Sequence, residues 1–576
     1  MRIVVAYKWA PNPQGAVVGA GGVVDWSRAE PDLSEYDPVA FELARCLADG
    51  TGGEVIGLTA GTRRVSVSVA RQAALARGLD RCVIVADDAL DGAGTTELAA
   101  VLAAAVRRID EVDLVITGDS SVDVGAKLVP AVLAGQLGWP ALGEVTAVTG
   151  GAGLLRVERI LDGGTQVIEI TGPAVLAAST DAAAPRLLSM RDIQAAGKKP
   201  AEILELADCD LPASGATVTV TATSRPDLKA RRGSSSIPPT PRRPPPSSSP
   251  PCTAPACSER PHDGKEATTM SLDTWIVVAG DPAIGDLIET ARSLGGQVTA
   301  VVAGPRAVAE TVAAGGVDKV VWLGEPGSAP VEAYATAAAD AIEAAPGVML
   351  GATRPSDRVL LGAVAARLQA PCLIAPSALS AEGDSLVVTH STSGGIAEET
   401  VVVAGPLAVT LDGGPVPVAN ATSGKAPVQE VVAVPLQMTV VETRDPVFEQ
   451  VDLGAARRVV SVGRGLKAQV DIAMIEAFAK ASHSEIACSR PLATGLGWLN
   501  RDRYVGISGQ RVAPAVYFAI GISGQLQHMI GVRGATTIVA INSDPNAPVF
   551  KEADYCLVGD LYKIVPALTA ALTAAL

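Results

Sequence analysis

Residues 515–530 read AVYFAIGISGQLQHMI, and this stretch decides the fold of the last part of the chain. It begins as an apolar run typical of a buried strand, turns at Gly521 to Gly524, and continues from Gln525 as the start of a helix. Buried strands that are followed directly by helices are typical of parallel α/β sheets. We therefore predict a doubly wound α/β domain around this stretch.

Four further segments repeat the strand-then-helix pattern. They read RVVSVG at 458–463, EIACSR at 485–490, TTIVAIN at 536–542 and DYCLVGD at 554–560. Small or polar residues follow or close each strand, and in a parallel sheet these ends meet at one edge, where ligands bind. Glycines let backbone amides approach a phosphate, and Asn542 and Asp560 can hold ribose hydroxyls. Taken singly, Asn542 also fits an ordinary turn and Asp560 a helix N-cap, but together the ends predict a nucleotide site.

The remaining sequence shows the same alternation on both sides of a Pro/Ser-rich stretch. Strand-like runs such as EVIGLTA at 54–60 and QVTAVVAG at 297–304 alternate with Ala/Leu-rich helical segments. Residues 225–269 contain too few apolar side chains to form a core, so we expect a disordered linker. The fold class is therefore α/β, with three doubly wound domains at 1–224, 270–445 and 446–576.

Composition narrows the function classes. The chain has 576 residues and a net charge of −15, which disfavours nucleic acid as a partner. No apolar run reaches the roughly 18 residues of a membrane span, so we expect a cytoplasmic protein that is not embedded in a membrane. The eight cysteines and four histidines lack the spacing of a metal site or a hydrolase triad, so we expect no metal and no catalytic residue.

Five motifs of the last domain resemble the electron-transfer flavoprotein α subunit in sequence, order and spacing. They are GRGLK at 463–467, CSRP at 488–491, GISGQ to RVAP at 506–514, GISGQLQH at 521–528 and AINSDPNAPVFKEADY at 540–555. The resemblance implies a Rossmann-like FAD-binding domain at 446–576, preceded by that subunit's N-terminal domain at 270–445. Both N-terminal-type domains of the chain are then nucleotide-binding-like.

The same resemblance implies where FAD lies. Arg490 falls where the family sets an arginine against the isoalloxazine ring, where a cation favours negative charge on the flavin. Ser489 is beside it, His528 corresponds to a histidine near the flavin O2, and Ser508 to a hydroxyl near N5. Ile507 departs from the family pattern, because a glutamine is usual there. The full set of expected cofactor-binding residues is Arg464, Ser489, Arg490, Val505, Gly506, Ile507, Ser508, Ser523, Gly524, Gln525, Leu526, Gln527, His528, Asn542, Asp560 and Leu561.

The first 224 residues resemble the β subunit of the same family. The motifs are VVAYKWAP at 4–11, LSEYDPVAFELA at 33–44, GLTAG at 57–61 and VERILDGG at 157–164. That subunit usually holds a structural AMP, with a phosphate loop ending in Thr-Gly-Gln. Here the corresponding loop, 118–129, lacks Thr-Gly-Gln. Backbone amides at 124–126 with Lys127 can compensate, or the loop binds no nucleotide, and the sequence leaves both open.

The family's partner-recognition loop also has a counterpart in the β-like part. Met190 stands where a leucine is usual, and the following segment ends in Lys198 and Lys199. A flexible thioether suits an apolar pocket on a dehydrogenase. The alternative is an ordinary surface turn with a basic helix end.

The resemblance implies an electron carrier rather than an enzyme. The implied donors are flavin dehydrogenases such as the acyl-CoA dehydrogenases of fatty acid β-oxidation, and the implied acceptor is a membrane-bound quinone oxidoreductase or a similar protein. The β-like and α-like halves are expected to pack on each other. Three alternatives stay open. A second FAD in the β-like half would make the protein electron-bifurcating, or the chain is a non-redox adenine-nucleotide sensor. In the third alternative the linker 225–269 is a translated spacer and the working protein is two chains.

Overall fold

The structure is a computed structural model that describes residues 1–575 except 20, 162–163, 227–233, 236–271, 343–346, 420–423, 446–450, 452 and 508. The chain forms two compact units, Met1–Leu228 with Met270–Gln450 and Lys229–Thr269 with Val451–Leu576. Each unit is described by itself. The predicted linker and Ser508 lie outside the described residues, apart from a few linker positions.

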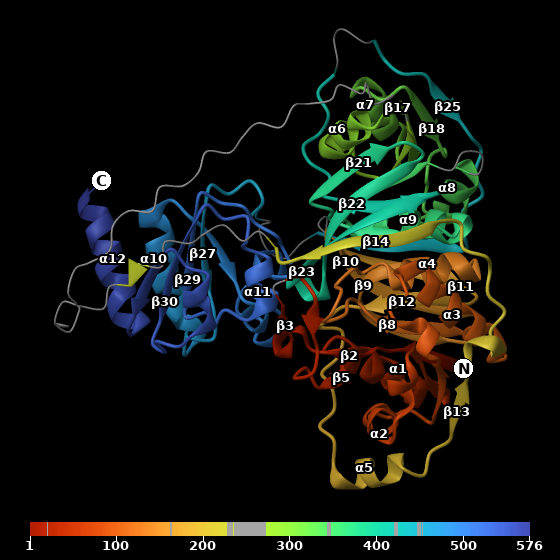
Figure 1. The fold of residues 1–576 in the computed structure, drawn as a ribbon, viewed down its shortest axis with the longest axis horizontal. Coiled ribbons are helices and arrows are strands. Elements are labelled where there is room, and N and C mark those ends of the chain that lie inside the picture. Colours follow the sequence, from red (N-terminus) through yellow and green to blue (C-terminus); the bar gives the residue numbers. More distant parts are fainter. Residues whose placement is uncertain are drawn as a thin grey trace. The chain divides into compact units, whose positions relative to one another are not determined.

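The first unit contains a ten-stranded sheet built mostly from the β-like half (Figure 1). Its first seven strands run parallel and its last pairs are antiparallel. In spatial order the strands are β13 (Ala201–Leu204), β7 (Arg81–Ala86), β6 (Glu54–Gly61), β1 (Arg2–Ala6), β8 (Leu114–Gly118), β12 (Ala174–Ala178), β9 (Ala141–Gly151), β10 (Leu154–Leu161), β11 (Gly164–Thr171) and β26 (Met438–Arg444). The helices of this half are α1 (Asp37–Thr51), α2 (Ser68–Leu75), α3 (Thr95–Arg108), α4 (Val129–Leu137) and α5 (Met190–Ala196).

The α-like part of the same unit supplies most of the strands of two further sheets. One is wholly parallel, in the order β20 (Cys372–Ile374), β24 (Leu407–Leu411), β19 (Val348–Ala352), β16 (Leu272–Ala279), β17 (Gly295–Ala303), β18 (Lys319–Trp322) and β25 (Val428–Glu430). The other is antiparallel, in the order β14 (Thr217–Ser224), β23 (Ala397–Ala404), β22 (Ser385–Thr392) and β21 (Ala378–Glu382). The helices are α6 (Gly285–Ser293), α7 (Arg306–Ala314), α8 (Ala335–Ala341) and α9 (Pro355–Leu368), with a short turn η5 (Val331–Tyr334).

The two halves exchange strands. Strand β14 precedes the linker but pairs with β23, and β26 follows the α-like sheets but pairs with β11. An unpaired edge exposes backbone donors and acceptors, so each half satisfies an edge of the other. The exchanged strands join the halves into one unit. The division into domains at 224 and 445 stays a prediction.

Helices α4 and α9 join the halves in the core. A Cβ on Gly362 would lie 2.5 Å from the Cβ of Ala131, and one on Gly135 would lie 2.7 Å from the Cβ of Ala366. Only glycine allows the two backbones to approach so closely. Buried apolar side chains of both halves form one continuous cluster around this crossing.

The second unit is a parallel sheet with helices. Its order is β15 (Ser234–Ser235), β31 (Tyr555–Val558), β30 (Thr537–Asn542), β29 (Val516–Ile520), β27 (Arg458–Val462) and β28 (Glu485–Cys488). Helices α10 (Ile472–Ser482), α11 (Leu526–Ile530) and α12 (Leu561–Ala575) accompany it. The predicted α/β class is confirmed. In the described part of the chain, no helix combines the length and hydropathy needed to cross a bilayer.

Candidate functional site

The sheet of the second unit reverses its direction of winding at β27. From β27 the chain passes to β28 on one side and then to β29 on the other, and all these pairings are parallel. At such a switch point the connections leave in opposite directions and open a crevice beyond the carboxyl ends of the strands. The loops after β27 and β29 form the two sides of this crevice.

Glycines bring those two loops together. A Cβ on Gly463 would lie 2.5 Å from the carbonyl oxygen of Gly521, and a Cβ on Gly465 would lie 2.7 Å from the Cα of Gly521. Gly521 itself has a φ of +62°, which side chains on L residues disfavour. The crevice is therefore bordered by bare backbone, as close approach to a phosphate requires. Arg464 is exposed on the same loop.

The loops after β29 and β30 are tied to each other. The Asn542 amide donates to the carbonyl of Ile522 at 2.9 Å, and its oxygen accepts from the backbone of Asp544 at 3.0 Å. Ser523 is exposed, and Gly524 lies so near Val549 that a Cβ would meet the Val549 nitrogen at 2.1 Å. The side chain of Asn542 thus shapes the loops, while Ser523 has its hydroxyl at the surface.

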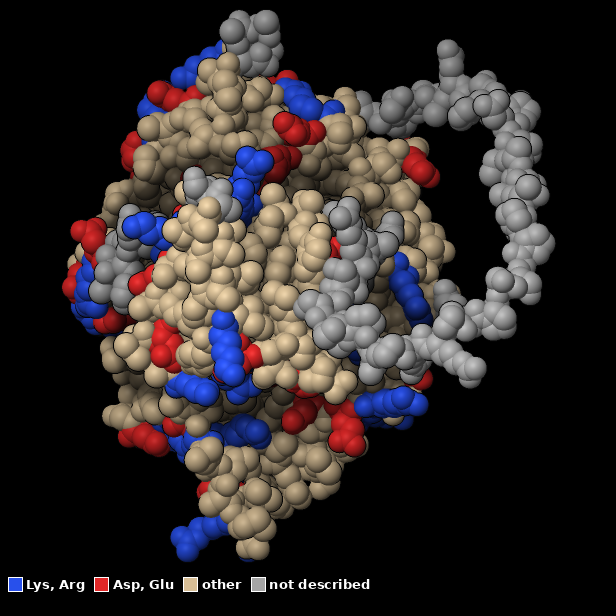
Figure 2. Space-filling model, turned by 90° about the vertical axis from the view of Figure 1, so that its left-hand side faces the viewer, with Lys and Arg blue, Asp and Glu red and all other residues tan. Residues whose placement is uncertain are grey.

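Asp560 caps the final helix. Its carboxylate accepts from the Tyr562 backbone at 3.0 Å, and Leu561 is buried beside it. The Tyr562 hydroxyl accepts from the Lys467 backbone at 2.8 Å, which fixes the loop after β27 against α12. Sequence reasoning missed this tyrosine, because an aromatic residue in an amphipathic helix has the pattern of an ordinary core position. Helix α12 carries one charged side chain, that of Lys563, and Figure 2 shows a largely tan area between blue and red side chains.

His528, on α11, is the buried polar group of the site. Its Nε2 lies 2.8 Å from the Tyr517 hydroxyl, whereas its Nδ1 is buried and has no partner of ordinary hydrogen-bond geometry among the described residues, which leave out Ser508. Burial lowers the pKa of His528 to about 4, and the polar backbone of Val505 raises this pKa by a smaller amount. The imidazole is therefore neutral at pH 7. When Tyr517 donates to Nε2, Nδ1 carries the ring hydrogen and is a donor for a ligand. Tyr517 was not predicted, because a tyrosine within an apolar strand is indistinguishable from core.

The segment 505–507 lies against α11. The backbone nitrogen of Ile507 donates to the Gln527 carbonyl at 2.7 Å, and that of Val505 donates to the Cys488 carbonyl at 3.0 Å. Val505, Gly506 and Ile507 are all buried. This segment therefore connects the end of β28 with the start of α11. Leu526 and Gln527 are half-buried and Gln525 is exposed at the helix N-cap.

Ser489 and Arg490 leave the end of β28. The Ser489 backbone donates to the Val462 carbonyl at 3.0 Å, so this end lies beside the end of β27. Both side chains are half-buried, and Arg490 immediately precedes the turn Pro491–Gly495. The structure thus brings Arg490 to the same edge as the glycine loops.

These groups fit an anionic dinucleotide. Residues 451–576 contain twelve Lys and Arg against nine Asp and Glu, a net charge of +3 in a chain of net −15. Glycine-lined backbone suits a pyrophosphate, and the buried Nδ1 of His528 has no partner of ordinary hydrogen-bond geometry in the described part of the chain. The fold and the site together define a nucleotide-binding α/β protein.

Comparison with known proteins identifies the family. Residues 21–209 and 281–436 match the electron transfer flavoprotein domain, and residues 452–533 match the electron transfer flavoprotein FAD-binding domain. The chain belongs to the electron transfer flavoprotein family. Its β-like and α-like parts are fused in one polypeptide, and FAD is its cofactor. The chain is 37% identical over 306 residues to Protein FixB of Escherichia coli O81 (strain ED1a), of Escherichia coli O157:H7 and, separately, of Shigella flexneri, which covers 52% of this chain and 97% of each relative.

The predicted recognition loop lies in the first unit. Met190 begins α5, which Ser189 caps, and its side chain is 71% exposed. Leu187 nearby is 96% exposed, so apolar side chains project from this loop. Lys198 is exposed, but Lys199 donates to the Leu75 carbonyl at 3.1 Å and is tied to the fold.

Proposed function

We propose that the chain receives electrons from flavin dehydrogenases, such as acyl-CoA dehydrogenases, and passes them to a quinone-linked oxidoreductase or a similar acceptor. FAD, when bound, supplies the redox chemistry. The observation that carries the proposal is the coincidence of the FAD-binding-domain match with a switch-point crevice bordered by glycine backbone and a buried, neutral histidine. Members of this family are electron carriers, and the proposed pathway is fatty acid β-oxidation.

Within this proposal each residue of the site has a separate task. The loops at Gly463 to Gly465 and Gly521 to Gly524 receive the pyrophosphate. Arg490 supplies a positive charge, and the Nδ1 of His528 supplies one hydrogen bond. The remaining predicted positions line the cofactor, and Ser508 is kept as a proposed contact from the resemblance.

The exposed loop at Met190 is the proposed docking element for the donor. Its apolar side chains are of the kind that fill pockets on a partner, and Lys198 adds a positive charge for an acidic rim. We propose the cytoplasm as compartment, because the scattered cysteines 46, 82, 209, 372, 488 and 556 form no disulfide within the described chain.

The deciding experiment is a visible spectrum of the full chain as purified, with flavin quantified after denaturation. One FAD per chain, reducible by an acyl-CoA dehydrogenase and its substrate, supports the carrier. Two flavins per chain would instead indicate the bifurcating alternative. A colourless protein that does not take up FAD would overturn the proposal and favour a sensor.

A further inference from the structure

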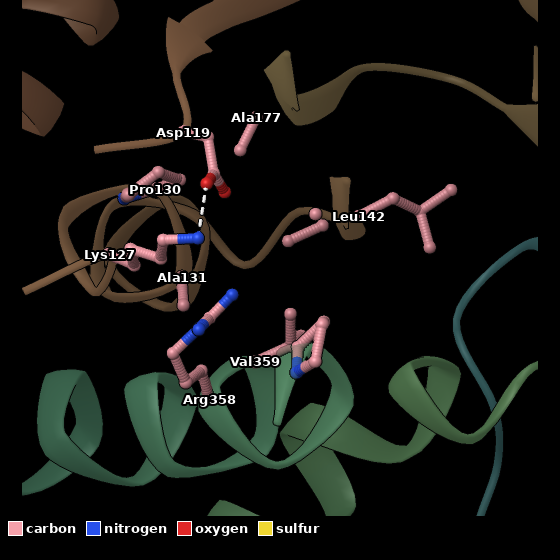
Figure 3. A pocket seen from close by; sticks show the side chains of 11 residues that line it. Asp119, Lys127, Pro130, Ala131, Leu142, Ala177, Arg358 and Val359 are labelled. Atoms are coloured by element: carbon pink, nitrogen blue, oxygen red, sulfur yellow. Dashed lines mark ion pairs between the residues drawn. The ribbon is translucent and has the colours of Figure 1, made fainter. Parts of the chain in front are cut away.

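Loop 118–129, which follows β8, contains an internal ion pair in the segment where the resemblance to the β subunit implies an AMP phosphate. The Nζ of Lys127 lies 2.6 Å from Asp119 and 3.6 Å from Glu144. The side chains of Lys127 and Glu144 are 12% exposed and that of Asp119 is 3% exposed. Figure 3 shows the Lys127 ammonium group pointing to Asp119. The ammonium group of Lys127 is thus already paired with two carboxylates of the protein.

The pair continues into the α-like half. Arg358, on α9, lies 3.8 Å from Glu144 with an 11% exposed side chain and also donates to the Thr353 carbonyl at 2.8 Å. Figure 3 shows Arg358 approaching the cavity from α9, opposite Asp119. Asp119, Lys127, Glu144 and Arg358, here called the bridging network, therefore connect the two halves next to the α4 and α9 crossing. The cavity lined by Asp119, Lys127 and Arg358 has a volume of about 20 Å³, room for one water molecule.

A second pair closes the other side of the loop. Lys8, after β1, lies 2.7 Å from Asp123, and its backbone donates to the buried Asp37 carboxyl at 2.8 Å. Asp37 is the first residue of α1, so the first turn of this helix already carries an acidic side chain of the protein.

The paired charges of this region and the lack of side-chain hydrogen-bond donors in the segment Val129 to Ala131 both disfavour binding of a nucleotide phosphate. Three cations, Lys8, Lys127 and Arg358, are each paired with a carboxylate. A phosphate monoester adds a charge of roughly −1.5 to −2, and breaking a buried pair to receive it leaves a carboxylate uncompensated. The segment Val129 to Ala131 has no side-chain donor, and Pro130 has no N–H.

Two buried hydroxyls lie beside this region. The Oγ atoms of Ser34 and Ser120 have no hydrogen-bond partner in the described chain. Each is neutral, so ordered water satisfies it without any change in charge. These hydroxyls do not offset the surplus of negative charge that a phosphate would bring.

We propose that the β-like half of this chain holds no AMP, and that the bridging network replaces the nucleotide as the polar junction between the halves. The inference rests on the family membership. It depends on the proposed function only for the position of the FAD. The same charge balance opposes a second FAD in this half, since its diphosphate would need the same cations.

The test is nucleotide analysis of the purified full chain. The protein is denatured, and FAD and AMP are separated and quantified; the expected result is about one FAD and less than 0.1 AMP per chain. Equilibrium dialysis against 1 mM AMP should likewise show no uptake. AMP near one per chain overturns the inference, whereas missing FAD with no AMP contradicts only the proposed function.

A variant series tests the role of the network. Lys127→Met leaves Asp119 without its cation and Glu144 with Arg358 alone, and should lower the urea unfolding midpoint, while Lys127→Arg should restore most of it. Arg292→Met, which removes an exposed pair with Asp318, is the matched control. A Lys127→Met midpoint equal to that of this control would contradict the junction role. If Lys127→Met does not fold, the comparison of Lys127→Arg with wild type and the AMP analysis still decide.

Discussion

Removing Arg159 from its buried ion pair with Glu332 should strongly destabilise the first unit. Arg159, on β10, donates from Nη1 at 2.5 Å and from Nη2 at 3.0 Å to the carboxylate of Glu332, in η5 of the α-like half, and their side chains are 2% and 0% exposed. Gln166 accepts from the guanidinium at 2.8 Å and Ser356 donates to the carboxylate. Every polar group of the pair is therefore satisfied inside the core.

Burial raises the pKa of Glu332, but the charge of Arg159 and the hydrogen bonds from Arg159 and Ser356 outweigh it and hold the pKa below its usual value. Arg159→Met leaves Glu332 as a buried charge without a counter-ion, which costs about 3–5 kcal/mol. With a urea m value of about 3 kcal/mol/M, the midpoint should fall by roughly 1–1.7 M. Arg159→Met/Glu332→Leu should lose less, because no charge remains to be solvated.

The assay is urea unfolding followed by tryptophan fluorescence, which reports mainly on the first unit because five of the six tryptophans lie there. The control is Arg156→Met, since Arg156 also crosses between the halves, 3.4 Å from Glu442, but with side chains 44% and 42% exposed. Exposed pairs contribute about 1 kcal/mol or less. If Arg159→Met shifts the midpoint no more than Arg156→Met does, the reasoning from burial is wrong.

Three further predictions concern pH, the cofactor and docking. Burial raises the pKa of Asp37 to about 7, above an unfolded value of about 3.9, so the stability that Asp37 contributes is present at low pH and is lost as pH rises to 7. Asp37→Asn should therefore gain stability over wild type as the pH rises from 4 to 7. Urea midpoints of the two proteins that run parallel from pH 4 to 8 would contradict this. Arg490→Met should make the flavin potential more negative by roughly 30–65 mV if it removes one charge-assisted hydrogen bond of about 1.5–3 kcal/mol; a spectroelectrochemical titration with an unchanged potential would remove Arg490 from the ring. Met190→Ala should weaken docking to a dehydrogenase about fivefold or more at unchanged FAD content, whereas Ile203→Ala, an equally apolar site that is 49% exposed, should not; equal reduction kinetics for the two variants would rule out the loop.

The positions of the strand ends were predictable from local sequence. The apolar runs before Gly463 and Gly521 are β27 and β29. Backbone sterics and side-chain periodicity act over a few residues, so short patterns are enough to place these elements. Because parallel strands end at one edge, the strands alone were enough to predict that these loops share an edge of the sheet.

The sequence by itself determined the α/β class, the glycine loops and the family of this protein. Only the tertiary structure decided which charges and polar groups meet: Arg159 and Glu332 are 173 residues apart, and Lys127 joins Arg358 through Glu144. The same holds for the depressed pKa of His528, which depends on its burial against Tyr517 of another element. Solvation and pairing of a charge depend on everything that packs around it, and no local pattern encodes those neighbours.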